Sequence, residues 1–234
     1  MWTLLNVGPQ TIKMPTSFRF NYLRILDFNY QFYHPLLGVK NGICEVPHVI
    51  QILSSYPHIY ELHVYYPIWK LPETRQFSPH LAELNLEYNC LEEDPMPTLE
   101  KLPNLKILRL LGSYMPFLEK DMVCSEWGFP LLQYLFLCNL YLEEWRVEEG
   151  AMPSLSHLTI NYYTRLKTIL DGLRFITTLQ QLKIRNMMKS FKDRLDEGVL
   201  DFDKVKHCAF PCISKLWQRR AVATVMNYCI FDKF

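Results

Sequence analysis

The sequence has 234 residues, a length that fits one or two domains. Hydrophobic residues make up 49% and charged residues 21%, which are ordinary globular values and exclude a largely disordered or fibrous chain. Lys and Arg total 25 against 24 Asp and Glu, so the net charge of +1 gives the whole molecule no general attraction to nucleic acid or anionic lipid. Leucine is the unusual residue: there are 36, and all but Leu216 lie within the first 200 residues.

The cysteines and the first 20 residues indicate the cellular compartment of the protein. The 7 cysteines show no pair spacing, which is typical of reduced thiols in a cytosolic protein. The first 20 residues contain no charged region followed by an apolar one, so no signal peptide is predicted. The longest apolar stretch, 129–142, is interrupted by Gln133 and Asn139 and is too short to span a bilayer. We therefore expect a cytoplasmic protein with no membrane span.

In chain order, the sequence divides into four segments. Residues 1–19 form a lead-in or partial coil, and residues 20–188 carry a repeating leucine pattern. Within that second segment, residues 46–54 predict a short helix on the outer side of the repeats. Residues 189–208 are expected to cap the repeats, with a helix over 189–200, and residues 209–234 to form a poorly ordered tail without the leucine period.

The leucine pattern is a true repeat. The segment from Leu81 to Leu91 fits L-x-x-L-x-L-x-x-N-x-L at every fixed position, with the Asn at Asn89. The shorter core L-x-x-L-x-L, with conservative replacements, recurs as Leu23/Leu26/Phe28, Ile59/Leu62/Val64, Leu105/Leu108/Leu110, Leu132/Leu135/Leu137, Leu155/Leu158/Ile160 and Leu179/Leu182/Ile184. From Ile59 onward the first positions are 22, 24, 27, 23 and 24 residues apart, which is the range of leucine-rich repeats.

The spacing has a physical reason. In x-x-L-x-L-x-x the two apolar residues alternate with polar ones, so one face of a short strand points inward. No single coil can bury that face, but identical neighbouring strands stack the leucines into a continuous core. Asn89 is expected to satisfy backbone groups where the chain leaves the strand. Any one segment could also be an amphipathic helix, but seven matches favour an α/β leucine-rich-repeat solenoid with a parallel sheet on its concave face and irregular loops and short helices on its convex face.

The segments between the leucines carry a more specific likeness. The junctions 99–108, 127–135, 142–155 and 166–173 look like those of plant intracellular nucleotide-binding leucine-rich-repeat disease resistance proteins. The string E-E-W-x-V-E-E-G-A-M-P-S-L at 143–155 is the most specific part, and the likeness is to the coiled-coil class of this family. It runs from about residue 20 to residue 207, and 190–207 resembles the usual end of such proteins.

The chain departs from that family in two ways. Family members carry an upstream coiled coil and a nucleotide-binding switch with a G-x-x-x-x-G-K-[ST] phosphate loop and an M-H-D motif, and neither motif occurs here. Nucleotide binding is therefore not carried over, because the loop's backbone N–H groups and its Lys are what hold the phosphates. The second departure is the end, 209–234, which matches nothing in the family and suggests a truncated gene or a faulty gene model.

No motif in the chain predicts catalysis or a cofactor. The patterns G-x-S-x-G, H-E-x-x-H and C-x-x-C are all absent. His207, Cys208 and Cys212 lie close together but fall short of a four-ligand zinc site, so incidental thiols are favoured and no metal site is expected. The acid pairs in 143–149 are interpreted as a solvated loop, and Cys124 and Cys138 have no cationic neighbour motif that would activate a thiol.

The concave strand face is the predicted functional surface. Partner-binding residues are expected between the core leucines, just beyond them, or beside them as aromatic side chains: Asp27, His63, Tyr65, Asn85, Glu87, Tyr88, Arg109, Tyr134, Phe136, Thr159, Asn161, Lys183 and Arg185. Tyr and Arg are the residue types that dominate protein interfaces. The alternative is ordinary solvated sheet, with the tyrosines packed on cross-strand neighbours.

The resemblance implies a non-catalytic recognition module of plant innate immunity. Its partner would be a protein: a pathogen effector, a guarded host protein or a related chain of the same family. Two alternatives stay open, a leucine-rich-repeat substrate adaptor of a ubiquitin ligase and a non-functional truncated resistance-gene product. The adaptor would need an F-box, for which residues 1–19 are too short.

Overall fold

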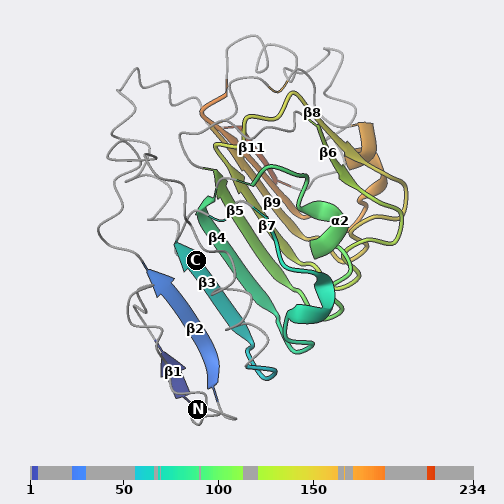
Figure 1. The fold of residues 1–234 in the computed structure, drawn as a ribbon. Helices are drawn as coiled ribbons and strands as arrows, with labels where there is room; N and C mark the ends of the chain where they lie inside the picture. Colours follow the sequence, from blue (N-terminus) through green and yellow to red (C-terminus); the bar gives the residue numbers. More distant parts are fainter. Residues whose placement is uncertain are drawn as a thin grey trace, which may run out of the picture.

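The computed structural model describes residues 2–4, 23–29, 56–65, 68, 70–89, 91–112, 121–162, 166, 171–187 and 210–213. Within them, one long sheet of parallel strands winds through the molecule (Figure 1). In spatial order its strands are β1 (Trp2–Leu4), β2 (Leu23–Asn29), β3 (Glu61–Tyr65), β4 (Glu83–Asn89), β5 (Ile107–Gly112), β7 (Tyr134–Cys138), β9 (His157–Asn161), β10 (Gln181–Arg185) and β11 (Phe210–Ile213). Each strand pairs with the next coil's strand, as a solenoid requires.

The core lies on one face of this sheet. Along β3 and β10 buried and partly exposed residues alternate, because successive side chains of a strand point to opposite faces. Leu84 and Leu86 of the complete repeat are 0% and 2% exposed. The inward side chains form one apolar cluster that runs from Leu23 to Ile184. The predicted leucine-rich-repeat solenoid is therefore confirmed.

Backbone hydrogen bonds continue the stacking just before the strands. Gln133 N–H donates to the carbonyl of Lys106 at 2.8 Å, Ser156 N–H to that of Gln133 at 3.0 Å, and Gln180 N–H to that of Ser156 at 2.9 Å. Each coil thus donates to the coil before it at the same place. This ladder satisfies main-chain groups that would otherwise be buried without partners.

Several strands end at a residue in the left-handed region. The φ angles are 53° at Asn139, 56° at Tyr162 and 52° at Asn186, each directly after a strand. Asparagine tolerates this conformation better than most residues. The side-chain amide of Asn186 donates to the Asn161 side-chain oxygen at 2.9 Å, so asparagines link adjacent coils where the chain turns. The side chain of Asn89, for which we predicted this role, lies outside the described residues.

Short elements cover the core from the other side. They are the helix α2 (Met96–Leu99), the 3-10 helices η2 (Thr74–Gln76) and η3 (Asp171–Phe175), and a second parallel sheet of β6 (Asp121–Cys124) and β8 (Glu144–Val147). In Figure 1, α2, β6 and β8 lie to the right of strands β4, β5 and β7 of the long sheet. The loop that we expected around the acid pairs is therefore partly a strand, because Trp145 and Val147 alternate inward with Glu144 and Arg146 outward.

The first and last strands of the long sheet lie in the two segments that we placed outside the leucine repeat, 1–19 and 209–234. Trp2–Leu4 pairs with β2, as a partial coil would. At the other end, Phe210–Ile213 was expected to belong to a poorly ordered tail but pairs with β10. The leucine pattern gave no sign of β11 because Pro211 stands in register with Leu182, where the repeat has leucine. The helices expected at 46–54 and 189–200 lie outside the described residues. No helix within the described part of the chain is both long and apolar enough to cross a bilayer.

Candidate functional site

The face of the sheet opposite the core, which we call the concave face, presents three rows of side chains across the strands. The first row is Ile25, Glu61, Glu83, Ile107, Tyr134, His157 and Gln181. The second row is Asp27, His63, Asn85, Arg109, Phe136, Thr159 and Lys183. The third row is Tyr65, Glu87, Leu111, Cys138, Asn161 and Arg185. The backbone of Asn29 stands in register with Tyr65, and its side chain lies outside the described residues.

The structure brings the predicted residues into these rows, with different exposures. Asp27, His63, Arg109, Phe136, Thr159 and Lys183 are partly exposed in the second row. Asn85, Glu87 and Asn161 are only 6%, 7% and 4% exposed, so they offer a partner little surface. Tyr88 lies on β4, and its side chain is outside the described residues.

Sequence reasoning missed most of the first row. We singled out Tyr134 for its aromatic ring but not Glu61, Glu83 or His157, which lie on the same face. The signal was present: these positions precede the second core leucine by one, and strand alternation puts them on the solvent side. The candidate surface therefore includes the first row as well as the second and third rows.

Charge is divided along the concave face. Over β2, β3 and β4 the described rows hold Asp27, Glu61, Glu83 and Glu87, with His63 among them. From β5 to β10 they hold Arg109, Lys183 and Arg185 and no acidic residue. We call these the acidic half and the basic half.

Glu83 of the acidic half contacts two charged or titratable side chains, Arg109 and His63. Its Oε1 accepts a hydrogen bond from the Arg109 guanidinium, and it lies 3.6 Å from His63 Nε2. The His63 imidazole and the Arg109 guanidinium hold the pKa of the Glu83 carboxyl below its usual range, against the effect of burial. Glu83 therefore remains charged under ordinary conditions and joins the two halves of the face.

The other titratable groups of the acidic half are shifted the opposite way. Burial raises the pKa of Asp27, although the charge of His63 opposes this. Burial also raises the pKa of Glu87, whose Oε1 accepts a hydrogen bond from the Asn85 amide at 2.9 Å. Tyr65 has its pKa raised to about 12 by burial and by the neighbouring Glu87 charge. The phenol of Tyr65 therefore stays protonated.

The basic half contains a shallow aromatic pocket. The rings of Tyr134 and His157 are stacked with centroids 4.4 Å apart and planes 19° apart. Arg109, Phe136 and Lys183 also line this pocket. Burial, helped by the Lys183 charge, lowers the pKa of His157, so its ring is neutral at physiological pH. A flat aromatic stack flanked by cations is a surface that suits a protein partner carrying acidic and aromatic groups.

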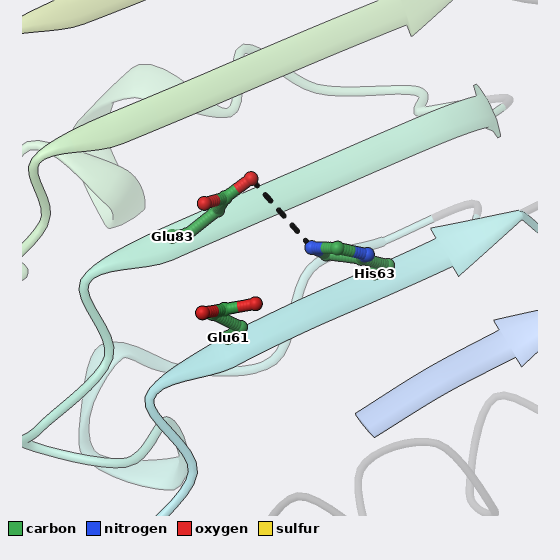
Figure 2. A group of neighbouring side chains, drawn as sticks. All are labelled: Glu61, His63 and Glu83. Carbon is green, nitrogen blue, oxygen red and sulfur yellow. Dashed lines mark ion pairs between the residues drawn. The ribbon is translucent and has the colours of Figure 1, made fainter. Parts of the chain in front are cut away.

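One group of side chains has the composition of a metal site. Glu61 and His63 project from β3 and Glu83 from β4, and one ligand atom of each lies within 4.8 Å of the others (Figure 2). We predicted no metal site from the sequence. His207 and Cys208, the only other candidates weighed, lie outside the described residues together with the side chain of Cys212.

The described cysteines are not arranged for reaction. Cys124 and Cys138 form no disulfide, and both are completely buried. Burial raises the pKa of the Cys124 thiol to about 12, against the hydrogen bond from Trp145. A thiol in this state is a weak nucleophile.

Comparison with known proteins finds plant disease resistance proteins among the relatives of this chain. No protein-family model matches the sequence. Over 157 residues, 67% of the chain, it is 44% identical to the probable disease resistance RPP8-like protein 4 and 45% identical to the disease resistance protein RPP8, both of Arabidopsis thaliana. Over 163 residues, 69% of the chain, it is 39% identical to the disease resistance RPP8-like protein 3 of the same plant.

The matched region is a minor part of these relatives. The chain spans only 17% of the first two and 18% of the third. The described part of the chain is a solenoid of leucine-rich repeats, and the resemblance that the junction segments carry is confirmed. Repeat architecture and sequence similarity together place the chain among the leucine-rich-repeat regions of plant disease resistance proteins.

Proposed function

We propose that the chain is a non-catalytic protein-recognition module of the plant immune response, and that it binds its partner on the concave face. The observation that carries this proposal is the division of that face into an acidic half and a basic half. Seven neighbouring strands from β2 to β10 expose it, a width that accommodates a standard interface. Opposite charges at the two ends select both the partner and its orientation.

The partner classes follow from the resemblance to resistance proteins. They are a pathogen effector, a guarded host protein, or a chain of the same family whose resting state the repeats control. The ubiquitin-ligase adaptor and the non-functional fragment are less favoured, since the relatives described above are disease resistance proteins. We further propose that the module acts in the cytoplasm.

Lys183 is the residue with which to test the proposal. It lies in the second row of the basic half and lines the aromatic pocket, so reversing its charge changes the surface at the pocket. Candidate partners found by proximity labelling in plant cells would be purified and titrated against the wild-type chain and Lys183→Glu. We expect affinity to fall at least tenfold for a partner with an acidic contact surface.

The matched control is Lys101→Glu, an equal charge reversal at an exposed residue next to α2, outside the three rows. Its affinity should equal that of the wild type. A partner whose binding responds equally to both substitutions, or to neither, would remove the concave-face assignment. Saturable hydrolysis of a nucleotide or ester by the purified chain would overturn the non-catalytic assignment.

A further inference from the structure

Three buried polar atoms without hydrogen-bond partners lie in one row of the acidic half. They are Asp27 Oδ1, His63 Nε2 and Asn85 Oδ1, and they are the only such side-chain atoms within the described part of the chain. Their residues are in register across β2, β3 and β4. Native structures seldom leave buried polar atoms unsatisfied, because an unpaired buried group has lost its water without gaining a partner. Two of the three are carbonyl or carboxylate oxygens and the third is an imidazole nitrogen, all of them atoms that a cation accepts as ligands.

The group of Glu61, His63 and Glu83 shares His63 with this row. Glu61 and His63 are two residues apart on β3 and so share a face, and Glu83 is in register with Glu61 on β4. Figure 2 shows the three side chains converging above the two strands. The two observations meet at one atom: His63 Nε2 is buried without a hydrogen-bond partner, and it is also the imidazole nitrogen that faces Glu83.

The distances suit a small divalent ion. Ligands bound tetrahedrally at about 2.0–2.1 Å lie about 3.4 Å from one another. His63 Nε2 and Glu83 Oε1 are 3.6 Å apart, too far for a hydrogen bond but close to that separation. The whole set of ligand atoms lies within 4.8 Å, so a small rotation of the Glu61 side chain completes the site. The side chains of His63 and Glu83 are 22% and 20% exposed, which leaves an ion a route of entry.

Neighbouring groups support the ligands as surrounding residues do in metal sites. The Arg109 guanidinium donates to Glu83 Oε1, the same oxygen that faces His63 Nε2, and Asp27 lies in register with His63 on its other side. Metal-binding carboxylates are commonly hydrogen-bonded in this way, and ligand histidines commonly have a carboxylate neighbour. The Arg109 charge opposes a cation, but Asp27, Glu61 and Glu83 outweigh it at short range.

We propose that Glu61, His63 and Glu83 form a binding site for a first-row divalent transition-metal ion, with Zn²⁺ as the ion that fits best. One imidazole with two carboxylates favours such an ion over Mg²⁺ or Ca²⁺, which prefer oxygen ligands alone. The site is independent of the proposed partner recognition, and its ligands come from strands that the repeat already fixes in register. Binding adds two positive charges to the acidic half of the concave face.

Calorimetric titration of the full, EDTA-treated chain with ZnCl₂ tests this site. We expect one strong binding event per chain, and at least a tenfold loss of affinity in each of Glu61→Gln and His63→Gln. Both substitutions keep the size of a side chain that is partly exposed, and circular dichroism confirms that the variants fold. Co²⁺ added in place of Zn²⁺ should give a visible absorption band that is lost in His63→Gln.

The matched control is His157→Gln, which removes a histidine from the same face where the described rows hold no carboxylate neighbour. It should bind Zn²⁺ as the wild type does. Absence of binding to the wild type would overturn the site, and so would equal affinities in the wild type, Glu61→Gln and His63→Gln. Displacement of Zn²⁺ by an equal concentration of Mg²⁺ would also overturn it, because the imidazole would then contribute nothing. None of these results bears on Lys183 and partner binding.

Discussion

The indole N–H of Trp145 donates a hydrogen bond to the Cys124 sulfur at 3.4 Å, inside the core of the solenoid. The two residues lie on β8 and β6 and are 3% and 0% exposed. This contact joins the two strands of the second sheet, in which Met122 of β6 stands in register with Trp145 of β8. It serves the packing of the second sheet between consecutive coils.

Other residues of the same string also stabilise the convex side. The Glu148 carboxylate accepts a hydrogen bond from the Glu126 backbone N–H at 2.9 Å, and Gly150 has a φ of 83° that favours glycine. Ala151 and Met152 are buried at 4% and 0% exposure. The acid pairs that could suggest acid–base chemistry thus include a carboxylate with a structural role.

Replacing Trp145 with Ala should destabilise the protein strongly. A large aromatic side chain leaves a cavity in a close-packed core, at a typical cost of about 3–5 kcal/mol. Urea denaturation followed by circular dichroism measures this loss. The matched control is Trp127→Ala, which removes the same side chain where it is 71% exposed, and it should change the free energy of unfolding by less than about 0.5 kcal/mol. Equal losses in the two variants would contradict the packing role of Trp145.

Arg109 and Lys183 are both basic residues of the predicted partner-binding set, but the structure gives them different surroundings. The Arg109 guanidinium pairs with Glu83, and both side chains are about one-fifth exposed, at 22% and 20%. Arg109→Glu would break this pair and add a like charge, so it should lower the free energy of unfolding by on the order of 2 kcal/mol, between the values for exposed and buried pairs.

Lys183→Glu is the comparison for Arg109→Glu in thermal denaturation. Lys183 is partly exposed on β10 and lies in the basic half, where the described rows hold no carboxylate. Its reversal should leave the melting temperature nearly unchanged. If both variants melt at the same temperature, the Glu83–Arg109 pair contributes nothing to stability.

The leucine period predicted the core and the order of the strands because burial dictates it. Leu62, Leu84 and Leu108 are all 1% exposed or less, and their spacing alone placed them in neighbouring coils. The period could not reveal β11 or β8. Pro211 occupies a leucine position in β11, and in β8 the inward residues are Trp145 and Val147 over a length of four residues.

The sequence predicts which face of the sheet carries the candidate site, but not which side chains on that face lie close together. Alternation places Glu61, His63 and Glu83 on the solvent face, whereas their proximity depends on the register between β3 and β4. The gap of 36 residues between Leu23 and Ile59 hides where Asp27 will stand relative to His63. Asn85 and Glu87 are buried although they lie on the solvent side of the sheet. Their burial comes from side chains of neighbouring coils, so the sequence of one repeat does not predict it.

Glu87→Gln should stabilise the protein at neutral pH. Burial raises the pKa of Glu87 in the folded protein, so folding is penalised once the carboxyl is charged. The folded state binds more protons than the unfolded state between the ordinary Glu pKa and the raised one, so this contribution to stability falls as pH rises through that window. Glutamine keeps the acceptor for the Asn85 amide and removes the charge.

The measurement is the free energy of unfolding of Glu87→Gln relative to the wild type at two pH values. The gain should be about 1 kcal/mol at about pH 7 and smaller at about pH 4, where the folded wild type is also protonated. Glu149→Gln is the control, because Glu149 is exposed on the convex side. A gain that does not change with pH would show that the buried charge is not its cause.

The Cys124 thiol should resist alkylation while the protein is folded. Its pKa is raised to about 12, so at about pH 8 only about one molecule in ten thousand carries the thiolate, and the sulfur is fully buried. Iodoacetamide labelling followed by peptide mass spectrometry should find Cys124 unmodified in buffer and modified in urea. Rapid modification in buffer would mean that β6 opens readily.

Gly172 is required by the close approach of η3 to β8. A Cβ atom at this position would lie 2.0 Å from the Val147 carbonyl oxygen and 2.6 Å from the Val147 side chain, so the backbone must move to admit it. Gly172→Ala should therefore lower the free energy of unfolding by about 1–3 kcal/mol, the usual cost of overpacking, even though alanine reduces the entropy of the unfolded chain. Thr177→Ala, at an exposed position just after η3, should change it by less than about 0.5 kcal/mol in the same urea titration. Stabilisation by Gly172→Ala would show that this junction has room for a side chain, and that the D-G-L segment which resembles resistance proteins is not fixed by contact with β8.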